Sequence, residues 1–168
     1  MVDKKETNLD KSILISVVIN CYNGERFLKE AIDSVYSQTY SNWELIFWDN
    51  ASTDKTESIA RSYNNKLRYF KAPKLKLLHE ARNLALDKCR GDVIAFLDAD
   101  DIWLPDKLEK QVGFFSQDNK IIYGGYQHID AYGKKIGITQ NNCPSGFLTS
   151  ALILKNTISI GSVLIDTA

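Results

Sequence analysis

The sequence predicts an α/β fold whose sheet is parallel in its first half, and three observations point to it. Apolar stretches of strand length alternate with helical stretches four times between residues 13 and 116. The first of them, residues 13–20, is a nearly unbroken apolar run rich in β-branched residues, which is typical of a strand covered on both faces. A turn-rich break and a helix follow it, as in the βαβ units of a Rossmann-like, three-layer α/β/α sandwich.

Each element is expected where its periodicity is clearest. In the first helix the apolar side chains from Phe27 to Tyr36 fall on one helical face. The later strands and helices repeat the same order. The expected strands are 13–20, 43–48, 67–71 and 93–97, and the expected helices are 25–38, 54–63, 78–89 and 105–116.

Residues at the helix ends support these boundaries. Thr53 or Asp54 is expected to cap the second helix, because a side-chain oxygen there can accept a hydrogen bond from a free N–H of the first turn. Gly91 is expected to end the third helix in a left-handed conformation. Pro105 suits the first turn of the fourth helix, where its missing N–H costs nothing.

Beyond residue 117 the pattern changes to short strands, which makes the predicted sheet mixed. Strands are expected at 121–123, 126–129, 135–139 and 158–165, with a turn at 131–134, whereas 147–154 fits no single element. We therefore expect one domain over residues 1–168. It comprises a polar tail at 1–12, a ligand-binding part at 13–117 and an incomplete β region at 118–168.

Composition excludes several classes of function. Lysine plus arginine number 21 and aspartate plus glutamate number 21, so no overall field attracts nucleic acid or an anionic membrane, and no nucleic-acid partner is expected. The three cysteines, Cys21, Cys89 and Cys143, form no CxxC pair, which predicts a reduced cytoplasmic protein without a zinc site. Residues 1–12 do not resemble a signal peptide, and no apolar run approaches the roughly 20 residues of a membrane span.

The strongest candidate site is the acidic cluster after the fourth strand. Asp98 and Asp100 are two residues apart, so in extended chain both carboxylates face the same way. Together they can hold a hard cation through oxygen, which is the chemistry of Mg²⁺ or Mn²⁺ with phosphate ligands. The alternative is a solvated acidic loop that caps the next helix, a role that Asp101 would fill.

Side chains after the other strands widen this candidate site. Ligands of open α/β sheets bind outside the carboxyl ends of the strands. Asp49 could accept hydrogen bonds from a base or a ribose there, or it could simply form a turn. Tyr22 could stack on a base or pack under its loop. Arg82 could reach a phosphate or a base, or it could pair with Asp87 or Glu80 on the surface.

Five ordered segments resemble those of a family 2 glycosyltransferase with the GT-A fold. Residues 48–54 are similar to the family's V-D-D-G-S-T-D segment. Residues 91–101 are similar to its fourth-strand segment, in which a glycine and an acidic residue are followed by an apolar strand and then by D-x-D-D. An A-R-N helix start lies between them at residues 81–83. The segments are 15–24 (ISVVINCYNG), 31–40 (AIDSVYSQTY), 48–54 (WDNASTD), 81–83 (ARN) and 91–101 (GDVIAFLDADD).

The resemblance implies a reaction and a set of partners. Such enzymes transfer a sugar from a nucleotide donor, here a UDP-sugar, to a glycan or lipid-linked acceptor with inversion, as in polysaccharide biosynthesis. Residues 13–117 would be the nucleotide-sugar-binding part, and 118–168 the acceptor side. The implied location is cytoplasmic, peripheral at the inner face of the membrane.

The resemblance also implies roles for individual residues. Asp49 would bind the uracil, and Tyr22 and Asn23 would line the nucleotide pocket. Arg82 would hold the base or a phosphate. Asp98 would contact the ribose or the metal shell, and Asp100 would be the direct ligand of Mn²⁺ or Mg²⁺. All are read from the motif positions in this sequence.

Three departures qualify the resemblance. Asn50 and Ala51 stand where the family often has aspartate and glycine, and residues 77–80 replace a loop that commonly contains glycine. The acidic residue that activates the acceptor in the family would lie beyond Ala168, so the catalytic base is expected outside this chain. A non-catalytic nucleotide-sugar-binding module is therefore the alternative function.

Overall fold

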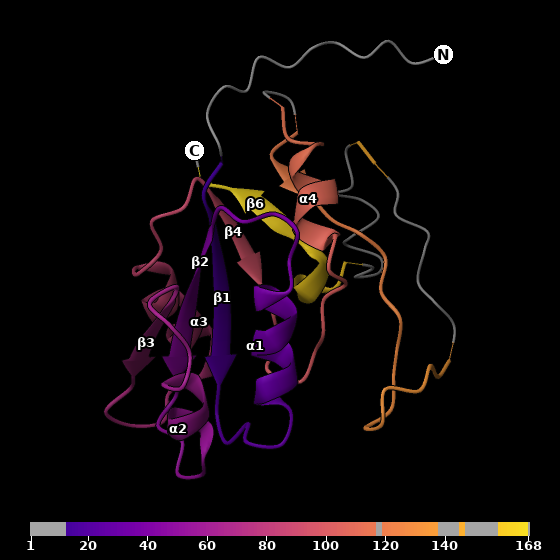
Figure 1. Cartoon of the computed structure of the whole chain (residues 1–168). Coiled ribbons are helices and arrows are strands. Elements are labelled where there is room, and N and C mark those ends of the chain that lie inside the picture. Colours follow the sequence, from indigo (N-terminus) through magenta and orange to yellow (C-terminus); the bar gives the residue numbers. More distant parts are fainter. Residues whose placement is uncertain (1–12, 117–118, 138–144, 147–157, 168) are drawn as a thin grey trace, which may run out of the picture.

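A computed structural model describes residues 13–116, 119–137, 145–146 and 158–167. These residues build a sheet of six strands in the order β3-β2-β1-β4-β6-β5 (Figure 1). The strands are β1 Ile15–Cys21, β2 Trp43–Asp49, β3 Leu67–Lys71, β4 Val93–Phe96, β5 Ile121–Ile122 and β6 Leu164–Asp166. The helices are α1 Leu28–Tyr36, α2 Thr56–Ala60, α3 Leu78–Leu86 and α4 Lys107–Val112, with a 3-10 turn η1 at Ile160–Ser162.

The sheet is mixed, and its first half is parallel as predicted. Strand β1 pairs in parallel with β2 on one side and with β4 on the other, and β3 continues the parallel set beyond β2. Strand β6 runs antiparallel to both β4 and β5. Strands β2 and β3 are added on one side of β1, and β4 is added on its other side. The position between β1 and β4 is therefore a topological switch point, which is where open α/β sheets bind ligands.

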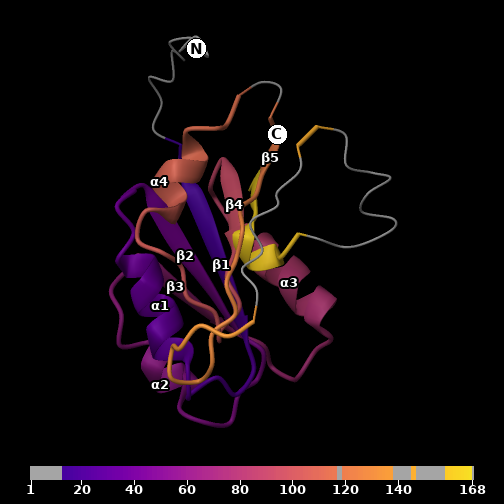
Figure 2. The same cartoon turned by 90° about the vertical axis from the view of Figure 1, so that its right-hand side faces the viewer.

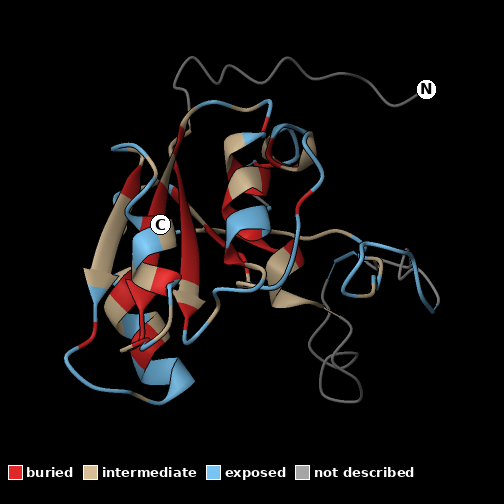
Figure 3. Cartoon of the chain, turned by 60° about the horizontal axis from the view of Figure 1, so that its bottom comes forward, coloured by how far each residue is buried: buried red, intermediate tan, exposed pale blue. Residues whose placement is uncertain are grey.

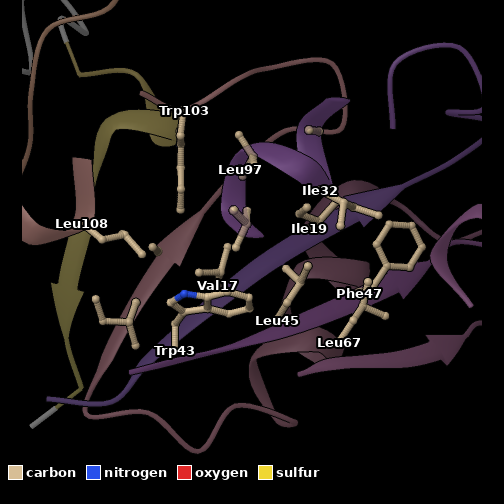
Figure 4. Packing of buried hydrophobic residues seen from close by; sticks show 14 of the residues in the cluster. Val17, Ile19, Ile32, Trp43, Leu45, Phe47, Leu67, Leu97, Trp103 and Leu108 are labelled. Atoms are coloured by element: carbon tan, nitrogen blue, oxygen red, sulfur yellow. The ribbon is translucent and has the colours of Figure 1, made fainter. Parts of the chain in front are cut away.

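Helices cover both faces, which confirms the three-layer sandwich. Helices α1, α2 and α4 lie on one face, and α3 lies on the other (Figure 2). The larger core lies under α1, where Ile32 meets β-strand side chains such as Val17, Ile19, Leu45 and Phe47 (Figure 4). The α3 face is thinner, because α3 contributes only small buried residues, which bring its backbone close to the sheet.

The helices are shorter than predicted, and the predicted helix-end residues act differently. Pro105 is not in the first turn of the fourth helix, because it lies two residues before Lys107, where α4 begins. Helix α2 starts at Thr56, so neither Thr53 nor Asp54 is its N-cap, although Asp54 accepts a hydrogen bond from the Thr56 N–H at 2.9 Å. The left-handed stop at Gly91 is wrong, since α3 ends at Leu86 and Gly91 has no positive φ. Gly91 is required for space instead, because a Cβ there would lie 2.6 Å from the Ser16 nitrogen.

The second half of the chain contains less regular structure than the sequence suggested. Within the described ranges, the strands expected at 126–129 and 135–139 are reduced to isolated bridge residues, among them Ile129 paired with Lys135, and residues 138–139 lie outside those ranges. Turn η1 takes up the start of the predicted 158–165 strand because Trp103 Nε1 and Gln111 Nε2 bind the carbonyls of Gly161 and Ser162 at 2.9 and 2.8 Å. The expectations for 1–12 and 147–154 and for Cys143 lie outside the described residues. No helix in the described ranges is long and apolar enough to cross a bilayer.

Candidate functional site

The loops after β1, β2 and β4 meet at one edge of the sheet. Strands β1 and β2 end in register, with Cys21 opposite Asp49. The first loop lies against the fourth-strand loop at Gly24, where an added Cβ would lie 3.7 Å from the Ala99 Cβ. Glycine at this position leaves room for the Cys21 sulfur, which an added Cβ would approach to 2.4 Å. The predicted convergence of these loops is therefore confirmed.

A set of side chains ties the first loop to the second. The Asn23 N–H donates to Ser52 Oγ at 3.0 Å, and the Thr53 N–H donates to Asn23 Oδ1 at 2.9 Å. The Gly24 N–H donates to Thr56 Oγ1 at 2.9 Å. The side chains of Ser52 and Thr56 thus tie residues 52–56 to the neighbouring loop, a role that sequence reasoning missed because it considered only Thr53 and Asp54 there, as helix caps.

Asp54 is part of this connection between the loops and makes it acid-sensitive. Its carboxylate accepts the N–H groups of Glu25 and Thr56, both at 2.9 Å. Partial burial works to raise the pKa of Asp54, but these hydrogen bonds outweigh it and hold the pKa below its ordinary value. A lowered folded-state pKa means that the stabilisation is complete above the unfolded pKa of about 3.9 and is lost as the pH falls.

We therefore expect Asp54→Asn to destabilise the chain near pH 6 and to lose most of that effect near pH 3. Urea unfolding of both proteins between pH 3 and 7 measures the difference. The exposed Asp87→Asn is the control and should give a small difference at every pH. A constant difference for Asp54→Asn over this range would contradict the assigned hydrogen bonds.

Asp49 is completely buried, and both of its carboxylate oxygens have internal partners. Oδ1 accepts the Ser52 N–H at 2.7 Å, and Oδ2 accepts the Tyr69 hydroxyl at 2.5 Å. Burial together with this bond to a carboxylate raises the pKa of Tyr69, so the hydroxyl stays protonated as a donor. The turn-forming role is therefore present, and the contact to a base stays a prediction.

Replacing Tyr69 with phenylalanine is expected to lower the free energy of unfolding by about 2 kcal/mol, because a buried charged oxygen loses its donor. Tyr36→Phe is the matched control. Its hydroxyl binds the exposed Asn64 at 2.8 Å, so its loss should cost less than about 1 kcal/mol. Urea unfolding measures both, and equal effects would argue against a special role for the Tyr69 bond.

Arg82 and Asp98 form an ion pair across α3 and the end of β4. Arg82 Nη2 lies 3.1 Å from Asp98 Oδ1, so the alternative pairing with Asp87 or Glu80 is wrong. The Asp98 side chain remains 46% exposed and Arg82 25% exposed, so both can still reach a ligand. Tyr22, at 51% exposure, is not packed under its loop.

Asp100 is exposed and has no hydrogen-bond or ion-pair partner in the described part of the chain. It borders an open pocket of about 200 Å³ between the start of α1 and the turn around Asp130. Asp130 itself accepts the N–H groups of Tyr132 and Lys134, so it caps its own turn. The pocket is lined by Phe27, Glu30, Asp100, Ile102, Ile129, Asp130, Ala131 and Gly133.

Negative charge is concentrated in the acidic cluster of Asp98, Asp100 and Asp101. Partial burial, followed by the charges of Asp98 and Asp100, raises the pKa of Asp101. Asp101 does not cap α4, which begins six residues later at Lys107. In the described ranges no three histidine, cysteine or carboxylate side chains converge on one metal position. Mg²⁺ and its relatives often use only one or two carboxylates and take the remaining ligands from phosphates and water, so Asp98 and Asp100 fit such an ion.

Asn50 and Ala51 differ from the family pattern, and each has a structural consequence. The Asn50 amide donates to the Lys76 carbonyl at 2.9 Å and accepts the Lys76 N–H at 3.1 Å, which fixes the loop before α3. Ala51 has φ of 66°, a left-handed conformation that suits the glycine of the family.

Ala51→Gly is therefore expected to stabilise the chain by about 0.5–1 kcal/mol, since relief of the left-handed penalty exceeds the added chain entropy. Ala31→Gly, inside α1, should instead destabilise it by at least about 1 kcal/mol. Thermal or urea unfolding measures whether each variant is more or less stable than the wild type. Destabilisation by Ala51→Gly would contradict the assigned backbone conformation.

Two buried donors on this edge lack partners. Asn20 Nδ2 and Trp48 Nε1 are the buried side-chain polar atoms without a hydrogen bond among the residues that the structure describes. The two residues face each other across β1 and β2 near their carboxyl ends. An unpaired buried donor costs about 1–3 kcal/mol, so an oxygen acceptor at this position would be stabilising. Asn20 was not singled out from the sequence, and Trp48 was considered there only as a core or rim aromatic.

Comparison with known proteins agrees with this arrangement. An uncharacterised glycosyltransferase of Haemophilus influenzae is 36% identical over 157 residues, which cover 91% of this chain and 62% of the relative. The relative named UDP-Glc:alpha-D-GlcNAc-diphosphoundecaprenol beta-1,3-glucosyltransferase WfgD, from Escherichia coli, is 36% identical over 151 residues, or 83% of this chain and 60% of that protein. The chain thus spans about three fifths of the length of these two relatives.

Solved structures share the fold. Staphylococcus aureus TarS (residues 1–349) in complex with UDP-GlcNAc is 28% identical with a TM-score of 0.58, over 61% of this chain and 31% of that one. The mannosyltransferase PcManGT of Pyrobaculum calidifontis, at 24% identity and a TM-score of 0.61 over 73% of this chain and 38% of that one, supports the same GT-A architecture. The sequence pattern described as Glycosyl transferase family 2 matches residues 16–162. With five motifs in order and their loops gathered at the switch point of a GT-A sheet, the chain belongs to glycosyl transferase family 2.

Proposed function

We propose that this chain is the donor-binding part of an inverting, metal-dependent glycosyltransferase that takes its sugar from a UDP-sugar. The observation that carries the proposal is the arrangement at the β1/β4 switch point. There the exposed Asp100 lies two residues from Asp98, which is already paired with Arg82. A free carboxylate beside an ion-paired carboxylate and guanidinium suits a ligand that carries both a metal ion and phosphates.

Two relatives support the choice of donor. The TarS structure contains UDP-GlcNAc, and the name of the E. coli relative specifies UDP-Glc as donor and a diphosphoundecaprenol-linked acceptor. We infer the same classes here, a UDP-hexose as donor and a glycan or lipid-linked glycan as acceptor. A peripheral position at the cytoplasmic face of the membrane belongs to this proposal.

The residue roles follow from their positions at the edge. Asp49 is buried and holds two internal donors, so its proposed hydrogen bond from the uracil requires the Ser52 N–H or the Tyr69 hydroxyl to move aside. Tyr22 stacks against the base, and Asn23 shapes the pocket wall. Arg82 binds a phosphate, and its ion pair with Asp98 weakens when it does so. Asp98 and Asp100 hold Mn²⁺ or Mg²⁺, which when bound would neutralise charge on the departing diphosphate.

The group that activates the acceptor is proposed to lie outside this chain. Of the carboxylates after Asp118, Asp130 caps its own turn and Asp166 is paired with Lys120 at 2.7 Å. Because both are engaged structurally, neither is proposed as the base. This engagement also favours the second candidate, a nucleotide-sugar-binding module without transfer activity, for the chain by itself.

Calorimetry with UDP tests the proposal. UDP should bind in the presence of Mn²⁺ and bind much more weakly with EDTA, whereas ADP under the same conditions should bind less tightly than UDP. Absence of UDP binding with Mn²⁺ present, in a chain shown to be folded by circular dichroism, would rule the proposal out. Transfer from UDP-glucose by the full-length protein then separates the enzyme from the binding module.

A further inference from the structure

An exposed loop between β3 and α3 combines leucines with lysines. Leu75, Leu77 and Leu78 are 55%, 65% and 55% exposed, and Lys74 and Lys76 alternate with the first two of them. In Figure 3 the loop is the mostly pale blue stretch that leaves the third strand and enters the exposed end of α3. Single exposed leucines are ordinary, but three within four residues form an apolar surface that needs an explanation.

The loop is held in this position by the protein. The Ala72 N–H donates to the Asp49 carbonyl at 2.8 Å, which continues the pairing of β3 with β2. The Asn50 side chain donates to the Lys76 carbonyl and accepts the Lys76 N–H, and Glu80 accepts the Leu77 N–H at 3.3 Å. The leucines are therefore presented outward by a fixed backbone, so ordering this loop costs little when it meets a partner.

The loop around the leucines carries a small excess of positive charge, because Lys74 and Lys76 outnumber Glu80, which stays charged while it accepts the Leu77 N–H. Lys71 is paired with Glu57 at 2.7 Å, and the carboxylate of Glu80 is turned to the backbone of its own loop. Lys74 and Lys76 have no acidic partner in the described ranges. Since the net charge of the chain is zero, this is a local basic patch and not a part of a general field.

We propose that residues 73–78 dock this domain on an anionic lipid surface, with Leu75, Leu77 and Leu78 in the interfacial region and Lys74 and Lys76 at the headgroups. Leucines beside lysines suit this interface, because the apolar groups leave water while the amines meet anionic lipid. The loop contains no tryptophan, tyrosine or arginine, the residues that dominate protein–protein hot spots, so a lipid partner fits better than a protein.

This inference deepens the proposed function, because it names the surface on which a lipid-linked acceptor would be met. The loop is fastened to Asp49 and Asn50, so the docked surface lies next to the candidate donor site. The test below uses no nucleotide. Failure of lipid binding and failure of UDP binding are therefore distinguishable.

Flotation with vesicles tests the docking surface. We expect the chain to float with vesicles of phosphatidylglycerol and phosphatidylethanolamine and to stay behind with phosphatidylcholine alone. The double variant Leu75→Ser/Leu77→Ser should lower the partition coefficient roughly tenfold. The double variant Lys74→Gln/Lys76→Gln should lower it by more than about tenfold, and added salt should weaken the wild type similarly.

Matched controls come from other exposed positions. Leu104, at 73% exposure and without a lysine within two residues, gives Leu104→Ser, and Lys135→Gln removes a surface charge outside the loop. Both should leave vesicle binding unchanged. No binding to anionic vesicles, or binding that the leucine variant does not weaken, would overturn the proposal. Loss of UDP binding in the leucine variant without any change in lipid binding would also overturn the proposal, since the loop would then belong to the nucleotide site. Concentration-dependent dimerisation that the leucine variant abolishes would overturn it as well.

Discussion

Replacing Asp100 with alanine is expected to remove the metal dependence of UDP binding. Loss of a residue that merely supports a metal ligand costs about 10–100-fold in metal affinity, so loss of a direct ligand should cost at least about 100-fold. Calorimetry with UDP at saturating Mn²⁺ measures the change. In the variant the affinity with Mn²⁺ should fall to that measured with EDTA, because Asp98 alone, shared with Arg82, is a poor site.

Asp87→Ala provides the control for this experiment. Asp87 is an exposed carboxylate at the end of α3, so its removal changes the net charge equally without touching the cluster. Its UDP affinity should match the wild type with and without Mn²⁺. If Asp100→Ala kept full metal dependence, the assignment of Asp100 as the metal ligand would be wrong.

Gly91→Ala is expected to cause the largest loss of stability among conservative changes. A Cβ at this position would lie 2.6 Å from the Ser16 nitrogen, 2.7 Å from the Leu14 carbonyl oxygen and 2.8 Å from Ser16 Oγ. Two of these atoms are backbone and cannot move without disturbing the start of β1. Overpacking typically costs about 1–3 kcal/mol, and the clash with two backbone atoms places this change at the upper end of that range, which urea unfolding would show as a lower midpoint.

Gly113→Ala is the matched change at a permissive site. Gly113 follows α4 with φ of −63°, and the nearest atom to an added Cβ is 3.7 Å away. This change should be neutral or stabilise by about 0.4–1 kcal/mol, because alanine has less chain entropy to lose. Comparable losses for both variants would show that close packing against β1 is not the reason for glycine at position 91.

The first half of the fold could be predicted because β1, β2 and β4 are dense apolar runs that the structure buries. The edge strand Leu67–Lys71 was predicted with the observed bounds although only Leu67 in it is buried. The second half could not, because its strands depend on distant side chains. Trp103 and Gln111 bind carbonyls of the turn at residues 160–162, and their approach cannot be read from that segment, although Ser162 also binds the Ser159 carbonyl within it.

The sequence predicted which residues lie at the candidate site better than it predicted the contacts that these residues make. Arg82 and Asp98 were both identified, but their pairing depends on how α3 packs on the sheet, which sequence spacing does not give. Asp49 was read as a ligand contact, and its bond to Tyr69 depends on the register of β2 and β3. Ser52 and Thr56 were missed because their hydrogen bonds cross to another loop.

A crystal structure of the chain with UDP and Mn²⁺ tests the central claim most directly, with the metal located by its anomalous scattering. The account predicts a manganese peak bound to the Asp100 carboxylate, bridging it to the diphosphate, with the uracil at the Asp49 end of the edge. Manganese bound only at Glu30 or Asp130, or UDP bound away from the carboxyl ends of β1, β2 and β4, would contradict it.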